Sequence, residues 1–383
     1  MNIKEFKLPS KIIFGESAIK ELANICRRLG KRHFLMCGKN SMKKIGVLNF
    51  LKKAFKKEDL ELKVFYKDRG EPTLEMVDAA QKMCKRFGAD TVIGIGGGSV
   101  IDLAKATSGI ANKERSIYEY MYKNIPLESE GLPFIAVPTT AGTGAEVTPN
   151  AVLISKERKF KKSFRSNFLF AKVVILDPLL TLNLDFKSTL YSVLDGIVQA
   201  IESYTSKNAS EFTQPLSIES LRLLYKGLKG LLKNLSDVNS RKELLYGSAL
   251  GGIALFNARL GAVHGIAHPI GALYNIPHGL ICSVLLPHVA EYNLEVCAPL
   301  YKKIAKVLGL KKDLKNKEAS LWLIRKIKSL LRKFNIPQNL RDLGVNKKDF
   351  DFIAKESLTS GSLKANKKPL GYSDVIKILE KAY

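Results

Sequence analysis

Several features are scarce or missing in this chain of 383 residues, and each absence excludes a class of protein. The five cysteines are odd in number and form no CxxC pair, which argues against a disulfide framework or a zinc ribbon and favours a reducing compartment. The chain contains no run of about 18 uncharged apolar residues, and its first residues lack the apolar core of a signal peptide. We therefore expect a cytoplasmic protein with no membrane partner.

Acidic residues are also scarce, because 62 Lys and Arg face only 36 Asp and Glu and leave a net charge of +26. This excess raises the alternative of a nucleic-acid-binding protein. The lysines are dispersed over helical patterns, however, without interleaved aromatic residues or a DNA-reading motif. We expect a solvated basic surface and no nucleic-acid partner, and keep nucleic-acid binding as a remote alternative.

The first half of the chain alternates short apolar segments with patterns of helical period. Apolar segments occupy 32–38, 61–67, 90–99, 132–140, 152–160 and 171–178, and helical patterns occupy 42–55, 73–88 and 100–110. Strand and helix in turn are typical of a parallel sheet that is covered on both faces. The sequence predicts an α/β fold with a Rossmann-like sheet here.

Long helical patterns replace this alternation from about residue 187. Segments 188–206, 214–235 and 320–334 have a period of 3.6, and strand signals are few. The sequence therefore predicts an all-helical second domain. We place the boundary near residue 185, with domains at 1–185 and 186–383.

The segment DTVIGIGGGSVIDLAK leads an apolar strand through glycines into a helix. Backbone N–H groups at Gly97 and Gly98 can approach an anion, because no Cβ intervenes and the positive end of a helix begins there. Ligands bind at the carboxyl ends of strands in such sheets. The segment predicts a pyrophosphate site, although a plain tight turn also fits, and Asp102 with Lys105 also fits an exposed helix pair.

A second polar turn follows segment 132–138 and reads TTAGTGAEVT. Its small hydroxyl residues suit hydrogen bonds to a sugar, a phosphate or a carboxamide. Thr140 and Thr143 also fit the role of helix caps. Both roles stay open.

Histidine is rare, yet three of the five histidines fall in HGIAHPIGALYNIPHG, at 264–279. His264 and His268 share a helix face, Pro269 restricts that helix, and Pro277 predicts a turn at His278. Imidazoles in apolar surroundings suit a divalent metal. Asp195, in an apolar helical segment, is the best anionic ligand, because coordination relieves the cost of a buried carboxylate. An N-cap or a basic partner would also explain it.

The motifs GGGSVIDLAK, PTTAGTGAEVT, LDG near an IE pair, and HGIAHPIGALYNIPHG together resemble those of the iron-containing, group III alcohol dehydrogenases. The resemblance implies a dinucleotide-binding α/β domain, a helical domain that holds metal and substrate, and an active site in the cleft. This architecture is shared with dehydroquinate synthase. It also implies NAD(P)-linked hydride transfer between an alcohol carbon and a nicotinamide, with the metal as a Lewis acid.

The family's ligands are an aspartate, a histidine four residues later, and two further histidines. By resemblance they fall on Asp195, Gln199, His264 and His278. The amide at Gln199 is a poor ligand, which leaves Fe²⁺ against Zn²⁺ open, and we favour a retained metal. His268 resembles the family's residue for proton transfer near the nicotinamide.

The resemblance also assigns cofactor-binding residues. NAD-preferring members carry an aspartate after an early strand, where this chain reads CGKNS, so we favour NADP(H) and leave NAD(H) open. The expected cofactor residues are Gly38, Lys39, Ser41, Gly97, Gly98, Ser99, Asp102, Thr139, Thr140, Thr143, Asn150 and Lys161.

Two function classes remain beside nucleic-acid binding. The favoured one is a metal-dependent alcohol dehydrogenase or aldehyde reductase with a small alcohol or aldehyde substrate, in a homodimer or higher homo-oligomer. The alternative is a lyase similar to dehydroquinate synthase that uses NAD transiently. That lyase needs several basic side chains for a polyanionic substrate, whereas 264–271 presents small apolar residues.

Overall fold

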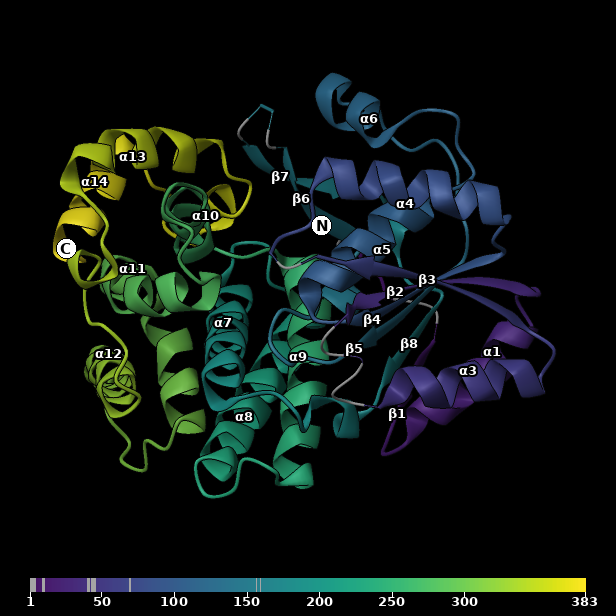
Figure 1. The fold of residues 1–383 in the computed structure, drawn as a ribbon. Helices are drawn as coiled ribbons and strands as arrows, with labels where there is room; N and C mark the ends of the chain where they lie inside the picture. Colours follow the sequence, from purple (N-terminus) through teal and green to yellow (C-terminus); the bar gives the residue numbers. More distant parts are fainter. Residues whose placement is uncertain are drawn as a thin grey trace. The chain divides into compact units, whose positions relative to one another are not determined.

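The computed structural model describes residues 5–8, 11–39, 42, 46–68, 70–155, 157–158 and 160–383. The chain forms two compact units (Figure 1). One comprises Leu8–Asp185 with Leu235–Leu245, and the other comprises Met1–Lys7, Phe186–Asn234 and Tyr246–Tyr383. We call them the α/β unit and the helical unit, after the elements that each contains.

The α/β unit contains a six-stranded sheet in the order β1-β8-β5-β4-β2-β3, in which every pairing is parallel. Its strands are β1 (Ile12–Phe14), β2 (Arg32–Gly38), β3 (Glu61–Lys67), β4 (Thr91–Gly96), β5 (Phe134–Pro138) and β8 (Val173–Leu176). The predicted parallel sheet is confirmed. Segment 152–160 differs from the single strand predicted there, because it spans two strands of a separate antiparallel pair, β6 (Asn150–Ser155) and β7 (Phe160–Arg165).

The strand order reverses direction between β2 and β4. From β2 the chain moves outward to β3, and after β4 it moves the other way to β5. The carboxyl ends of β2 and β4, where Gly38 and Gly97 lie, therefore flank a topological switch point. Open parallel sheets bind ligands at such points.

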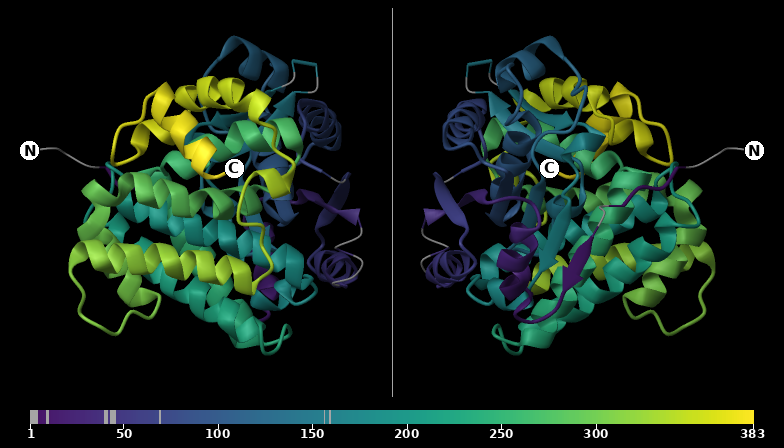
Figure 2. Two further views of the ribbon diagram at one scale, coloured as in Figure 1. Left: turned by 90° about the vertical axis from the view of Figure 1, so that its left-hand side faces the viewer. Right: turned by 90° about the vertical axis from the view of Figure 1, so that its right-hand side faces the viewer.

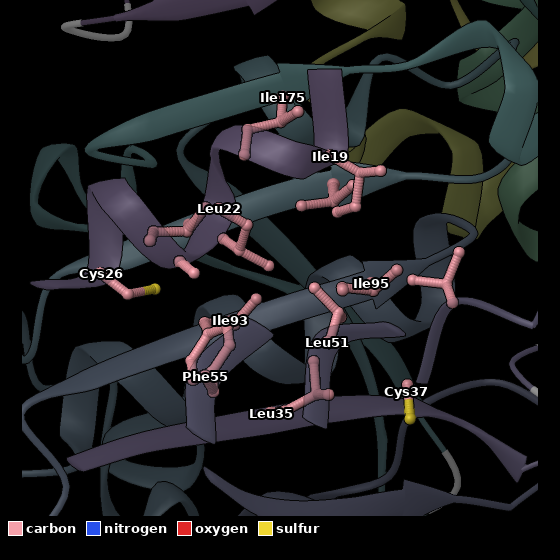
Figure 3. Close-up of a cluster of buried hydrophobic side chains, with 14 of the residues drawn as sticks. Ile19, Leu22, Cys26, Leu35, Cys37, Leu51, Phe55, Ile93, Ile95 and Ile175 are labelled. Atoms are coloured by element: carbon pink, nitrogen blue, oxygen red, sulfur yellow. The ribbon is translucent and has the colours of Figure 1, made fainter. Parts of the chain in front are cut away.

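Helices cover both faces of this sheet, as predicted. They are α1 (Leu22–Arg27), α3 (Val47–Lys57), α4 (Leu74–Phe87) and α5 (Gly98–Ile110), and α6 (Ile117–Lys123) packs on α4. Side chains of α1 and α3 pack with alternate strand residues such as Leu35, Ile93 and Ile95 in a buried cluster (Figure 3). On the other face α5 contacts β4 so closely that a Cβ on Gly94 would lie 2.8 Å from the Cβ of Ala104.

Local sequence sets the limits of α4. The hydroxyl of Thr73 accepts a hydrogen bond from the backbone N–H of Met76 at 3.3 Å and caps the helix N-terminus. Gly88 ends the helix in the left-handed region, at φ 64°, where glycine carries no Cβ penalty.

No strand occurs in residues 186–383, all of which the structure describes, so the predicted all-helical second half is confirmed. α7 packs against α8 and α11, and α11 packs against α12. Figure 2 shows these helices running side by side. The helices are α7 (Phe186–Thr205), α8 (Thr213–Leu231), α9 (Val238–Ala258), α10 (Ala262–Tyr274), α11 (His278–Val307), α12 (Asn316–Lys333), α13 (Phe350–Thr359) and α14 (Tyr372–Lys381).

Helix α11 is long and apolar enough to cross a membrane by length and composition alone. In the fold, however, 67% of its most apolar window is buried. Neighbouring helices rather than lipid therefore cover its apolar surface, which is the behaviour of a core helix.

Candidate functional site

Three predicted metal ligands converge in the helical unit. Oδ1 of Asp195, on α7, lies 3.5 Å from Nε2 of His264, on α10, and 3.8 Å from Nε2 of His278, on α11. Asp195 and His264 are buried, and the side chain of His278 is 30% exposed. The cluster thus reaches solvent on the side of His278.

Helical periodicity on α7 brings three polar side chains to one buried face. Asp195, Gln199 and Glu202 are spaced i, i+4 and i+7, and all three are buried. The amide nitrogen of Gln199 donates a hydrogen bond to Oδ2 of Asp195 at 2.9 Å. Gln199 therefore holds the carboxylate so that Oδ1 faces the imidazoles.

Glu202 holds His264 through the ring nitrogen that faces away from Asp195. Nδ1 of His264 donates to Oε2 of Glu202 at 2.6 Å, and the backbone N–H of Val263 donates to Oε1 at 2.6 Å. A carboxylate on one ring nitrogen fixes the tautomer and directs the other nitrogen, Nε2, toward Asp195. Glu202 is a functional residue that the sequence motifs do not indicate, although its i+7 spacing from Asp195 is a usable signal.

A glycine permits the close approach of α11 to α7. A Cβ on Gly279 would lie 2.0 Å from the carbonyl oxygen of Tyr191 and 3.0 Å from the Cβ of Asp195. Only glycine allows the start of α11 to lie there, and His278 precedes it as the first residue of the helix. His278 thus lies in a helix rather than in the turn predicted there, and the predicted turn ends at Pro277, the N-cap.

Pro269 does not end α10, which continues to Tyr274. The helix still ends soon afterwards, because Asn275 adopts the left-handed region at φ 51° and closes it. The short connection from Asn275 to Pro277 returns the chain so that His278 faces His264, with ring centroids 5.4 Å apart.

The donor set fits a divalent metal. Oδ1 of Asp195 and Nε2 of His264 are buried and lack a hydrogen-bond partner among the described residues. Tetrahedral coordination with bonds of about 2.1 Å separates two such ligand atoms by about 3.4 Å. The observed 3.5 Å between these atoms agrees with that spacing and is too long for a normal hydrogen bond.

A fourth donor, absent from the sequence prediction, is the thiol of Cys282. Its Sγ lies 3.6 Å from Nε2 of His278, and one ligand atom from each of Asp195, His264, His278 and Cys282 lies within 4.8 Å of all the others. Cys282 is buried and lies one turn after His278 on α11. A lone cysteine gives no such signal until the helix is known.

Electrostatics at this cluster favour the charged forms of its imidazole and thiol groups. Burial alone lowers the pKa of His264, but Cys282, Asp195 and Glu202 outweigh burial and raise that pKa well above its usual value. Burial alone raises the pKa of Cys282, but the two imidazoles outweigh it and lower that pKa. Mutual attraction between these groups causes both shifts.

His268 lies beside the cluster but outside the set of four donors. Its ring stacks on that of His278, with centroids 5.1 Å apart and an interplanar angle of 9°. His268 is exposed, unlike His264. Its imidazole can therefore exchange protons with solvent or with a bound molecule.

The two polar turns of the α/β unit lie against each other. The backbone N–H of Thr139 donates to the carbonyl of Gly96 at 2.9 Å. A Cβ on Gly97 would lie 3.1 Å from Cγ2 of Thr140, and one on Gly98 would lie 3.2 Å from Oγ1 of Thr143. Glycines thus leave space beside the threonines at the N-terminus of α5, which is a favourable place for a phosphate.

Asp102 and Lys105 do not form an exposed helix pair, because Asp102 is buried and Lys105 is 0% exposed. Nζ of Lys105 donates to the carbonyls of Ala145 at 2.6 Å and Asn150 at 2.7 Å. Oδ2 of Asp102 accepts from the backbone N–H of Val152 at 3.0 Å. Both side chains therefore anchor the segment that follows the threonine turn.

The other predicted cofactor residues are placed as follows. Gly38 ends β2, Lys39 follows it and is exposed, and Ser41 lies outside the described residues. Ser99 is half-buried in the first turn of α5. Asn150 pairs with Arg165 at the start of β6, whereas Lys161 pairs with Ile154, about 13 Å further along the strand. Nζ of Lys161 bonds Oε1 of Glu71 at 3.0 Å.

Comparison with known proteins matches both halves of the chain to one family. Residues 9–178 match the model of the iron-containing alcohol dehydrogenases, and residues 189–383 match the C-terminal model of the same family. The chain belongs to the iron-containing alcohol dehydrogenases. It is accordingly an oxidoreductase whose chemistry involves a divalent metal, a nicotinamide cofactor and a small alcohol or aldehyde.

Relatives of this alcohol dehydrogenase match over nearly their full length. Long-chain-alcohol dehydrogenase 1 of Geobacillus thermodenitrificans is 32% identical, covering 100% of this chain and 98% of the relative. The NAD-dependent methanol dehydrogenase of Bacillus methanolicus is 28% identical, covering 98% and 99%. A solved 1,3-propanediol oxidoreductase has a TM-score of 0.94 at 31% identity, with both chains covered completely. These matches favour neither the lyase nor the nucleic-acid alternative.

Proposed function

We propose that this alcohol dehydrogenase is an NADP(H)-preferring aldehyde reductase whose metal is held by Asp195, His264 and His278. The observation that carries the proposal is the convergence of one carboxylate oxygen and two imidazole nitrogens, at 3.5 and 3.8 Å. A divalent cation supplies Lewis-acid polarisation of the substrate oxygen when it is bound there. A bound nicotinamide would supply or accept the hydride.

The chain's own residues orient and complete this chemistry. Gln199 orients the carboxylate of Asp195 through a hydrogen bond of 2.9 Å. Glu202 orients the imidazole of His264 through a hydrogen bond of 2.6 Å. The exposed imidazole of His268, stacked on His278, takes the hydroxyl proton during alcohol oxidation and returns it during aldehyde reduction.

The turns after β2, β4 and β5 bind the cofactor in this proposal, with Gly97, Gly98 and Ser99 at the pyrophosphate. Thr139, Thr140, Thr143 and Asn150 line the nicotinamide half. Asp102 and Lys161 belong to the same proposed set, and each also bonds another group of the protein.

The preference for NADP(H) rests on the end of β2. Gly38 stands where an aspartate would repel the 2′-phosphate, and the exposed Lys39 attracts it. Family membership does not decide this choice, because the methanol dehydrogenase relative is named as NAD-dependent.

We also propose that the enzyme is cytoplasmic and dimeric, with the functional domains at 1–185 and 186–383. All five cysteines are free and buried, in keeping with a reducing compartment. The dimer is supported by the family resemblance, and sedimentation of the purified protein measures it directly.

The deciding experiment combines metal analysis with a steady-state assay. Purified protein is analysed for Fe and Zn, and NADPH oxidation is then followed against a panel of aldehydes, in parallel with NADH. We expect one metal per chain and sustained NADPH consumption, both lost in Asp195→Asn. A protein that retains its metal in Asp195→Asn, or that turns over without net NADPH oxidation, contradicts the proposal.

A further inference from the structure

Helix α11 contributes two donors to the metal cluster. His278 and Cys282 lie one turn apart on the same face, with Nε2 and Sγ separated by 3.6 Å. Each donor atom of Asp195, His264, His278 and Cys282 lies within 4.8 Å of the others. The thiol therefore shares one small volume with the carboxylate and both imidazoles.

The spacing agrees with shared coordination of one ion. Tetrahedral zinc with bonds of about 2.3 Å to sulfur and about 2.05 Å to nitrogen separates these two atoms by about 3.6 Å. The observed 3.6 Å between Sγ of Cys282 and Nε2 of His278 agrees with that value. It also agrees with a weak thiol–imidazole hydrogen bond, so the orphaned atoms decide between the two readings. Asp195 Oδ1 and His264 Nε2, both buried, have no hydrogen-bond partner among the described residues.

Gln199 does not fill the position that an imidazole would occupy in a family ligand set. Its amide nitrogen is engaged with Oδ2 of Asp195, and a donating N–H group cannot coordinate a cation. Its amide oxygen is also buried and lacks a hydrogen-bond partner among the described residues, but an amide oxygen is a weaker ligand for borderline metals than a thiolate is. The imidazole that Gln199 replaces on α7 is thus matched by an additional soft donor on α11, the thiol of Cys282.

We infer that Cys282 is the fourth protein ligand, so that the site is Asp-His-His-Cys, selects Zn²⁺ over Fe²⁺, and would take the substrate oxygen as an additional, fifth ligand. This inference rests on the proposed metal site at Asp195, His264 and His278. A thiolate favours zinc, whereas the replaced imidazole suits zinc and iron alike. Gln199 is then a positioning residue for Asp195.

Cys297 provides a matched control on the same helix. Both cysteines are 0% exposed, but Cys297 is not among the four clustered donors. Substitution of either by serine removes one buried thiol from α11. Only the change at Cys282 alters the proposed ligand set.

The test uses Co²⁺ as a spectroscopic probe in the full-length protein. A thiolate ligand to Co²⁺ gives a near-ultraviolet charge-transfer band, and ligand-field absorption in the visible reports that the ion is bound. We expect the band in the wild type and in Cys297→Ser and Gln199→Ala, and its loss in Cys282→Ser. Zn²⁺ affinity, measured against a chromophoric chelator, should fall about 100-fold or more in Cys282→Ser.

A double variant guards against a fold defect in Cys282→Ser. Gln199→His combined with Cys282→Ser restores an imidazole on α7, so bound Co²⁺ should return without the charge-transfer band. Co²⁺ bound by the wild type without the band overturns the thiolate ligand and leaves the proposed metal site standing. Failure of the wild type to bind Co²⁺ or Zn²⁺ overturns both. Preferential loading with Fe²⁺ when both ions are offered overturns the zinc selectivity.

Discussion

Glu202 and His264 share a hydrogen bond of 2.6 Å between Oε2 and Nδ1, inside a helical bundle where both side chains are buried. The same carboxylate accepts a hydrogen bond from the backbone N–H of Val263. The tautomer of His264, and the direction of its Nε2, therefore depend on a residue that does not itself face the cluster.

Glu202→Gln should weaken zinc binding about 10- to 100-fold, because the amide holds the imidazole less firmly and makes Nε2 less basic. Competition with a chromophoric chelator measures the affinity. Glu219→Gln on α8, a half-exposed glutamate paired with Arg222, serves as the control and should leave the affinity unchanged. Equal affinity in Glu202→Gln and the wild type would show that the hydrogen bond is dispensable.

His268→Gln should lower kcat by about 10²- to 10⁴-fold, because a proton donor and acceptor is lost beside the reacting oxygen. Metal content and thermal stability should remain at wild-type values, since His268 is exposed and is not among the four donors. Kinetics and metal analysis on the same preparation separate these effects. Loss of metal together with activity would instead assign His268 as a ligand.

Gly279→Ala should destabilise the helical unit by about 1–3 kcal/mol or more, because the new Cβ would lie 2.0 Å from the carbonyl of Tyr191. Metal affinity should fall as well, since His278 moves with the start of α11. The control is Gly271→Ala on α10, where the nearest atom to the new Cβ is 3.5 Å away. Denaturant unfolding compares the two, and equal stabilities would refute the close approach.

Gly38→Asp should raise the KM for NADPH about 10- to 100-fold, because the carboxylate repels the 2′-phosphate. The KM for NADH should stay within a few fold of the wild type by the same reasoning. Lys39→Ala provides a milder comparison, since it removes an attractive charge without adding a repulsive one. Parallel steady-state assays with both cofactors measure the ratio, and an unchanged ratio in Gly38→Asp would contradict the proposed site.

Glu146 should make stability depend on pH. Burial raises the pKa of its carboxyl from 4.5 to about 7, so the folded protein keeps a proton that the unfolded chain releases between these values. The native state binds more protons in this window, and its stability therefore falls as pH rises from 4.5 to 7. The free energy of unfolding of Glu146→Gln, relative to that of the wild type, should therefore rise by about 3 kcal/mol between pH 4.5 and 8. Denaturant midpoints at both pH values test this, and a constant difference would refute it.

The sequence predicted most of the sheet and three members of the metal cluster, because their signals are local. Gly97 and Thr140 follow neighbouring parallel strands, and the carboxyl ends of such strands share one edge. Asp195 and His264 belong to motifs that can be read without knowing what they contact. The short sequence motifs around these residues were therefore enough to predict their roles.

Other features depend on contacts between distant segments and could not be read from the pattern. Cys282 becomes a candidate ligand only because α11 begins at His278, which was predicted to lie in a turn. Lys105 was compatible with an exposed helix surface, since nothing in its neighbourhood shows that residues 145–150 fold over it. Glu202 had the right spacing, but its partner lies 62 residues away.

The inward direction of the Lys105 amine has a consequence for cofactor recognition. Because the Lys105 side chain donates to the carbonyls of Ala145 and Asn150, hydrogen bonds within the protein itself hold the polypeptide beyond β5 in its conformation. Association of a nucleotide at the proposed cofactor site would then lose little chain entropy at this edge. In the proposed cofactor site, the choice between NADP(H) and NAD(H) depends on the residues that follow β2, where Lys39 is exposed.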